Sequence, residues 1–294
     1  MGKKRIYALG FFDGVHLGHQ ALLDGCCRMA RSLNAQACAI TFDRHPRALF
    51  TEAAPKLINE TESRVALLRS YGMEQVTVYP VTEQTMSTPW EAFLDDLVKQ
   101  GAAGFVCGSD FRFGCRGEGS AEKLRSYCAQ KHLACSIIQE QTLDGIRVSS
   151  TYIRSLLESG QIQKANRFLG HPHVLSGEVV SGRKLGRTIG IPTANLVLPE
   201  QVVELAHGVY ACKAVVEGKE YMAVTNIGTR PTVGGHHVTV EPWLLDFEGD
   251  LYGKKIDLLF YEFLRPEKKF DSLEKLREEI QKNALQVRKI FEKS

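Results

Sequence analysis

Residues 6–23 read IYALGFFDGVHLGHQALL, an apolar run followed by a glycine-rich turn and an amphipathic segment. The apolar run predicts a buried strand, and the segment that begins near His16 predicts a helix. The turn contains Gly10, Asp13 and Gly14, and its glycines let the backbone approach a bound group closely. Because N–H groups at a helix N-terminus attract anions, this strand–loop–helix junction predicts a phosphate-binding site.

Two histidines stand at the start of the predicted helix. His16 and His19 are three residues apart, with Gly18 between them, so both project from one side of the first turn. An isolated HxGH tetrapeptide fits equally well with surface polar residues that open a helix. The surrounding sequence therefore has to decide between a phosphate site and a solvated turn.

The first half of the chain alternates short apolar runs with amphipathic segments, from IYALG near the N-terminus to ACSIIQ at 134–139. This alternation predicts βαβ units and an α/β domain with a Rossmann-like parallel sheet. A Ser149, Ser150, Thr151 cluster then precedes an apolar segment that carries Arg154 in its first turn. The cluster is typical of a helix N-cap, and an ordinary cap is the alternative to a ligand-binding motif.

The pattern of apolar residues changes at Gly170, His171 and Pro172, where strand-like runs interrupted by glycines begin. One amphipathic segment follows them, from about Ser272 to Phe291. This half predicts an antiparallel β-barrel with a C-terminal helix. The change of pattern indicates two domains, at 1–172 and 173–294.

The segment SGRKLGRTIGIPTAN at 181–195 combines glycines, basic residues and small polar residues. Glycines let such a loop wrap a nucleotide, basic side chains offset phosphate charge, and neutral oxygens suit Mg²⁺. The same composition also fits a solvated turn. The candidate nucleotide-binding residues here are Gly182, Lys184, Gly186 and Arg187, and the candidate magnesium ligands are Thr193 and Asn195.

Composition excludes little for a chain of 294 residues with a formal net charge of +3. No apolar run approaches the roughly 20 residues of a membrane span, and the N-terminus lacks the apolar core of a signal peptide. The eight cysteines show no paired metal spacing, which predicts buried free thiols. We therefore expect a cytoplasmic protein without a membrane or nucleic-acid partner, and its oligomeric state stays open.

Several motifs, taken together, resemble one enzyme family along nearly the whole chain. HxGH, TFDRHP (41–46), GSDFRFG (108–114) and SSTYIR (149–154) resemble the adenylyltransferase module of bacterial bifunctional riboflavin kinase/FMN adenylyltransferases, or FAD synthetases. The runs that resemble the riboflavin kinase module are PTAN (192–195), NIGTRPTVGG (226–235), VEPWLLDF (240–247), LYGKKI (251–256) and LRPEKKF (264–270).

The resemblance implies ATP, riboflavin and FMN as substrates, with Mg²⁺. It implies that His16, His19 and Arg154 hold the ATP triphosphate during adenylyl transfer, and that Glu241 is the candidate base of the kinase. Further binding residues would be those in the matching motifs, namely Gly10, Asp13, Gly14, Asp110, Ser150, Thr151 and Arg265.

The chain departs from the family pattern at three places, of which the stretch GGHH at 234–237 is one. Phe11 follows the first glycine where relatives often carry Asn, and Asn283 stands where relatives commonly carry Asp. Two other functions remain open, an FMN adenylyltransferase whose barrel has lost kinase activity and a flavin-binding regulator without turnover. Intact Thr193, Asn195 and Glu241 disfavour the first, and the joint presence of phosphate-handling motifs disfavours the second.

Overall fold

The computed structural model describes residues 3–51, 53–181, 190–232 and 235–292. The chain divides into two compact units, Met1–Leu57 with Thr61–Ser150, and Ile58–Glu60 with Thr151–Ser294. The second unit thus takes in residues 151–172, which the sequence analysis assigned to the first domain. The predicted boundary between residues 172 and 173 stays a prediction about which pieces fold and act.

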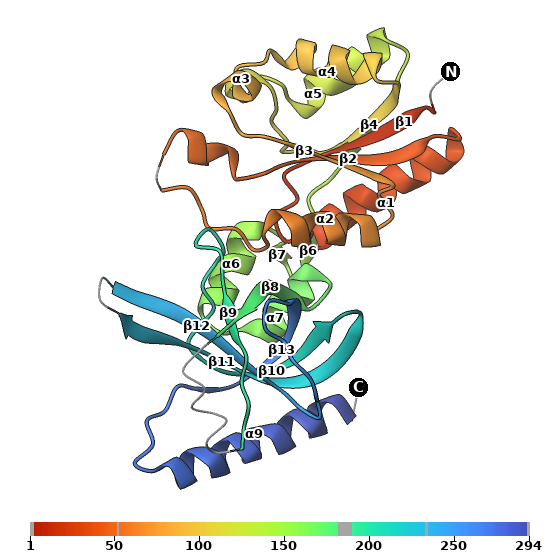
Figure 1. Cartoon of the computed structure of the whole chain (residues 1–294). Coiled ribbons are helices and arrows are strands. Elements are labelled where there is room, and N and C mark those ends of the chain that lie inside the picture. The colour runs from red at the N-terminus through yellow and green to blue at the C-terminus, as the bar shows by residue number, and fades with distance from the viewer. Residues whose placement is uncertain (1–2, 52, 182–189, 233–234, 293–294) are drawn as a thin grey trace. The chain divides into compact units, whose positions relative to one another are not determined.

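The first unit is built on a five-stranded sheet with the order β3-β2-β1-β4-β5. Every neighbouring pair in it is parallel, which confirms the Rossmann-like prediction. Figure 1 shows α1 and α2 on one face of the sheet and α4 and α5 on the other. The elements are β1 (Arg5–Leu9), α1 (Leu17–Ser32), β2 (Gln36–Phe42), α2 (Thr61–Ser70), β3 (Gln75–Tyr79), α3 (Glu83–Met86), α4 (Trp90–Lys99), β4 (Ala102–Gly108), α5 (Ala121–Gln130) and β5 (Ala134–Ile138).

Strand β1 is buried on both faces. Ile6 and Ala8 belong to the apolar cluster that includes residues of α1, and Tyr7 and Leu9 belong to the opposite cluster with residues of α4 and α5. Alternate strand residues point to opposite faces, so four consecutive apolar residues serve both cores. The end of β1 is therefore held firmly where the glycine-rich loop leaves it.

The second unit contains a closed barrel with the strand order β10-β11-β12-β9-β8-β13. All its neighbouring strands are antiparallel, and α9 (Leu273–Glu292) packs on the barrel through Ala284 and Val287. The predicted barrel with a terminal helix is confirmed. Its strands are β8 (His173–Val180), β9 (Asn195–Val197), β10 (Gly208–Val216), β11 (Lys219–Thr232), β12 (Gly235–Leu244) and β13 (Lys255–Pro266).

A short hairpin and two helices complete the description. The hairpin pairs β6 (Thr142–Leu143) with β7 (Ile146–Arg147) and leads into α6 (Ser150–Glu158) and α7 (Ile162–Leu169). In α7 the Asn166 amide donates to the carbonyl of Phe260 in β13, with 2.7 Å between nitrogen and oxygen. The same side chain accepts from the backbone N–H of His173 at 2.8 Å, so α7 is bonded to two barrel strands.

All eight cysteines are free thiols, and five of them are buried. Burial raises the pKa of Cys26 and of Cys107 to about 12, which keeps both thiols protonated near neutral pH. The prediction of free thiols packed in apolar surroundings is thereby confirmed for those five.

Candidate active sites

The loop between β1 and α1 has an unusual backbone. Phe12 (φ 59°), Gly14 (φ 83°) and Val15 (φ 40°) all have positive φ, and two of these residues carry side chains. A Cβ at Gly10 would lie 2.8 Å from the buried Phe12 ring, so a larger residue there would require that ring to shift. Positive φ at residues with a Cβ costs free energy and is concentrated at functional sites. The tight loop places the next residues at the start of α1.

His16 is the N-cap of α1, and its Nδ1 accepts a hydrogen bond from the backbone N–H of His19 at 3.3 Å. The two imidazole rings are stacked, with centroids 3.6 Å apart and planes at 11°. Burial, and then the neighbouring His16 and Arg64, hold the pKa of His19 well below its usual value. His19 is therefore neutral at pH 7, and its Nδ1 is buried with no hydrogen-bond partner in the described chain.

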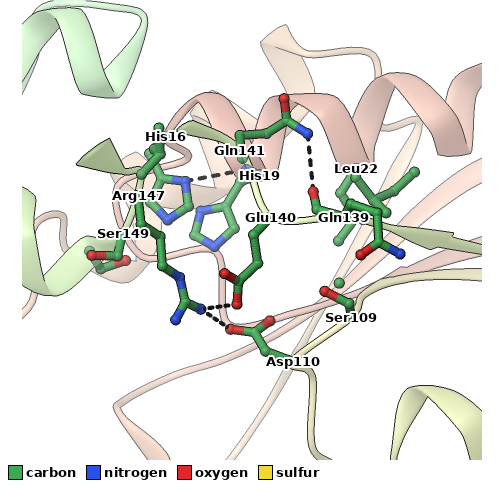
Figure 2. Close-up of a pocket in the computed structure, with 15 residues that line it drawn as sticks. His16, His19, Leu22, Ser109, Asp110, Gln139, Glu140, Gln141, Arg147 and Ser149 are labelled. Carbon is green, nitrogen blue, oxygen red and sulfur yellow. Dashed lines mark hydrogen bonds and ion pairs between the residues drawn. The ribbon is translucent and has the colours of Figure 1, made fainter. Parts of the chain in front are cut away.

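A cavity of about 240 Å³ opens beside the two histidines. It lies at the carboxyl ends of β4 and β5 and the start of α1, beside the β1–β4 pair at which the strand order 3-2-1-4-5 reverses direction. Open α/β sheets bind ligands at this switch point. Figure 2 shows that the lining comes from the start of α1, the end of β4, the segment after β5 and the residues leading into α6.

The cavity holds an ion-pair cluster that sequence reasoning missed. Arg147 Nη2 lies 2.5 Å from Asp110 Oδ2 and 2.7 Å from Glu140 Oε1 (Figure 2). Asp110, a predicted binding residue, therefore lines the cavity, while Arg147 and Glu140 were not predicted. Arg147 stands directly before the VSSTYIR run, but a lone arginine or glutamate carries no pattern that marks it as part of a site.

The segment before α6 joins the cavity to the glycine-rich loop. Ser149 and Ser150 line the cavity, and Ser150 Oγ donates to the carbonyl of Asp13 at 2.8 Å. Thr151 and Arg154 belong to the second compact unit, where Arg154 Nη1 lies 3.5 Å from Thr151 Oγ1. The predicted joint action of Arg154 with the two histidines stays a prediction.

In the barrel, strand register places polar residues of neighbouring strands in one row, the polar row, which consists of Asn195, Asn226, Glu241 and Arg265. Val209 pairs with Arg265 and with Asn226, and Asn226 pairs with Glu241. Directly paired residues project to the same face of a sheet. Val209 packs against Ala284 and Val287 of α9, so this row lies on the face that α9 covers. Asn226 was not predicted as a site residue, although the quoted NIGTRP run begins with it.

The row continues into β9. Val240 pairs with Leu196, and the backbone N–H of Ala194 donates to the carbonyl of Pro242 at 2.9 Å. In this antiparallel register Asn195 stands opposite Glu241. The structure thus brings the PTAN segment and the candidate base together, although they are 46 positions apart in the sequence.

Arg265 accounts for the departure at Asn283. Arg265 donates from Nε and Nη2 to Asn283 Oδ1 at 3.2 and 3.1 Å, and its Nε lies 3.4 Å from Glu279 Oε1. The amide oxygen accepts both bonds as a carboxylate would, while Glu279 supplies the negative charge. Burial lowers the pKa of Arg265, and Glu279 acts in the opposite direction.

The predicted nucleotide loop lies partly outside the described residues. Gly182, Lys184, Gly186 and Arg187 fall in the range 182–189, on which the structure is silent. Thr193 and Asn195 are described, and both are partly buried. Their hydroxyl and amide oxygens, with a carboxylate opposite, form a donor set of hard oxygens that fits Mg²⁺ bound together with phosphates and water.

These features define a two-module protein that joins an α/β unit of nucleotidyltransferase type to an antiparallel barrel that carries a row of polar residues. The comparisons agree on both modules. The family model for FAD synthetase matches residues 2–152, and the family model for riboflavin kinase matches residues 169–291. The chain belongs to the family of bifunctional riboflavin kinase/FMN adenylyltransferases.

Relatives of the same name match along almost the full chain. The protein from Listeria monocytogenes is 34% identical and that from Escherichia coli K12 is 37% identical. These alignments cover 98% and 97% of this chain and 93% and 92% of the two relatives. A solved structure described as a macrolide-efflux protein from Streptococcus pneumoniae matches with a TM-score of 0.87 at 29% identity, covering 98% of this chain and 95% of that one.

Proposed function

We propose that this chain phosphorylates riboflavin to FMN in its barrel and adenylylates FMN to FAD in its α/β unit, using ATP for both reactions. The carrying observation is that each module builds its own candidate site. The α/β unit has the histidine-lined cavity at the switch point of the sheet, and the barrel aligns Asn195, Glu241 and Arg265 in one row.

In adenylyl transfer a phosphate oxygen of FMN attacks the α-phosphorus of ATP, and pyrophosphate leaves. The attacking oxygen is already anionic, so the reaction needs positioning and charge neutralisation more than a base. His16 and His19 offer N–H donors at the cavity, and the amino end of α1 adds a positive dipole. The guanidinium of Arg154 would supply a full positive charge to offset the negative charge of the phosphates.

In the kinase reaction a riboflavin hydroxyl attacks the γ-phosphorus of ATP, the bond from that phosphorus to the ADP oxygen breaks so that ADP leaves, and the hydroxyl loses its proton. A carboxylate within hydrogen-bond reach is suited to this task, and Glu241 is the acidic residue of the polar row. Thr193 and Asn195 are the residues that would hold Mg²⁺ together with ATP, and the ion would supply positive charge to offset that of the phosphates.

We also infer a cytoplasmic location, where ATP is supplied to both reactions. Across the described residues, the helices are all too short or too polar to cross a bilayer. Free thiols at all eight cysteines agree with a reducing compartment.

The experiment is to incubate the purified chain with riboflavin, ATP and Mg²⁺, and to separate the flavins by chromatography over time. We expect FMN to rise first and FAD to follow, with pyrophosphate released in the second step. FAD from added FMN, without FMN from riboflavin, would indicate a monofunctional adenylyltransferase. Flavin binding without ATP consumption would indicate a regulator.

A further inference from the structure

Arg64 is the largest side chain that is fully buried in the described chain. It lies in the first half of α2, where its Nη2 donates to the carbonyl of Phe42, the last residue of β2, and to Thr61 Oγ1. Its Nε and Nη1 are buried and find no hydrogen-bond partner among the described residues. A guanidinium in this condition is expensive to keep in a protein interior. Packing alone would be served at least as well by an apolar side chain.

The aromatic face above this guanidinium belongs to Phe11, in the loop between β1 and α1. The Arg64 guanidinium carbon lies 4.6 Å from the centroid of the Phe11 ring, within the range of a cation–π contact. At the same residue, Thr41 Oγ1 donates to the backbone carbonyl of Phe11 at 2.7 Å. Phe11 therefore fixes the loop in two ways, because its ring contacts Arg64 and its backbone carbonyl is bonded to Thr41.

The charge of Arg64 interacts electrostatically with titratable residues in and around this loop. Burial lowers the pKa of Arg64, while the nearby carboxylates of Asp13 and Asp43 act in the opposite direction. Arginine keeps its proton even in such surroundings, so a fixed positive charge lies behind the glycine-rich loop. The same charge is one of the groups that disfavour protonation of His19 at the start of α1.

We propose that Arg64 is a positioning residue for adenylyl transfer, which acts through Phe11 to hold the Gly10–Gly14 loop in the shape that presents His16 and His19 to the triphosphate. The proposal rests on the adenylyltransferase function proposed above. It also assigns a task to Phe11, where the family pattern often has Asn. In this chain the residue at that position makes a cation–π contact with Arg64.

The test measures FAD formation from FMN and FMN formation from riboflavin on the same full-length preparations. The variants are Arg64→Met, which removes the charge at similar length, Arg64→Lys, Phe11→Leu and the double variant Phe11→Leu/Arg64→Met. Arg69→Met, at an exposed position near the end of α2, is the matched control. The thermal unfolding midpoint of each variant is recorded in parallel.

We expect Arg64→Met to lower kcat for FAD formation by about 10–10²-fold, with KM for FMN and ATP changed by less than about threefold, because the loop presents groups that act on the transition state. Kinase activity should not change, and Arg64→Lys should recover most of the loss. Phe11→Leu should reduce kcat less, and adding it to Arg64→Met should cost little more, since the two residues act as one unit.

The proposal is overturned if folded Arg64→Met makes FAD within about twofold of the wild type. It is also overturned if FAD and FMN formation fall together with the unfolding midpoint, which would show a structural role. If Arg64→Met does not fold, undiminished FAD formation in Phe11→Leu decides against the proposal. A wild-type chain that makes no FAD contradicts the proposed function itself, and that result is visible without any variant.

Discussion

His16 and His19 share one helical turn, but different contacts hold them. His16 caps the helix and accepts a backbone hydrogen bond, whereas His19 has a buried Nδ1 with no partner in the described chain. A buried polar atom left without a protein partner is costly, and such atoms are explained by a ligand, a water or a catalytic task. At the residue scale, His19 is therefore the better marker of the adenylyltransferase site.

We expect His19→Ala to slow FAD formation by about 10²–10³-fold, the usual cost of losing one oriented donor to a developing charge. The backbone N–H that His16 caps remains in this variant, so α1 should still form. FAD formation is followed by chromatography with FMN and ATP as substrates. FMN formation from riboflavin serves as the control and should be unchanged. An undiminished rate of FAD formation would remove His19 from the proposed mechanism.

Glu241→Gln tests the proposed base of the kinase. The substitution keeps the shape of the side chain but removes its basicity, so FMN formation should fall by about 10²–10⁴-fold. Riboflavin binding, measured by fluorescence quenching, should persist, and FAD formation from FMN should be near wild type. Glu248→Gln is the matched control, because Glu248 is exposed beyond the end of β12. If kinase turnover in Glu241→Gln stays within a few-fold of wild type, Glu241 is not the base of the kinase reaction.

At the scale of elements, the sequence predicted what local periodicity encodes and missed what pairing decides. Strand β1, the α1 junction and the terminal helix follow from runs of apolar residues, and the structure confirms them. Strand β9 is only Asn195–Val197, too short for a pattern, and it exists because β8 and β12 pair with it. Arg64 and Arg147 were missed for a related reason, since only tertiary packing puts them beside the loop and the cavity.

Strand β8 begins with a buried histidine that gives the barrel a predictable pH dependence. His173 is fully buried, and neither of its ring nitrogens has a hydrogen-bond partner among the described residues. Burial, and then the neighbouring His171, lower the pKa of His173 to about 3. This folded-state pKa lies below the unfolded-state value of roughly 6.5, so the unfolded chain binds a proton first as the pH falls.

The contribution of neutral His173 to stability is thus fully present above about pH 6.5 and is lost as the pH falls towards 3. Between pH 7 and pH 5 we expect a loss of about 2 kcal/mol in the free energy of unfolding from this group. His173→Phe should remove that part of the pH dependence. Urea unfolding followed by Trp243 fluorescence in a Trp90→Phe background reports on the barrel alone, because the chain has two tryptophans, one in each unit. The assignment would be contradicted if the Trp90→Phe protein and the Trp90→Phe/His173→Phe protein lost the same free energy of unfolding between pH 7 and pH 5.

At the scale of the whole molecule, the sequence and the packing place the division of the chain differently. Composition and periodicity change near Gly170, which predicts functional pieces 1–172 and 173–294. The compact units divide after Ser150 instead, and within the second unit α7 is bonded to β13 and β8 through Asn166. Polar bonding of this kind leaves no trace in hydrophobic periodicity.

A separate piece 173–294 would lose the partners of the Phe260 carbonyl and of the His173 N–H. It would also lose α7, whose buried Phe168 and Leu169 contribute about 1.5–3 kcal/mol each when they leave water. We therefore expect the piece 151–294 to unfold at a temperature about 10 °C or more above that of 173–294, measured by circular dichroism.

Both pieces should make FMN from riboflavin and ATP when folded, since the residues of the polar row lie beyond residue 173. The complementary piece 1–172 should make FAD from FMN, because it keeps HxGH and Arg154. Equal unfolding temperatures for the two barrel pieces would place α6 and α7 outside the barrel module. Folded pieces that lack the two activities would show instead that the modules act only when joined.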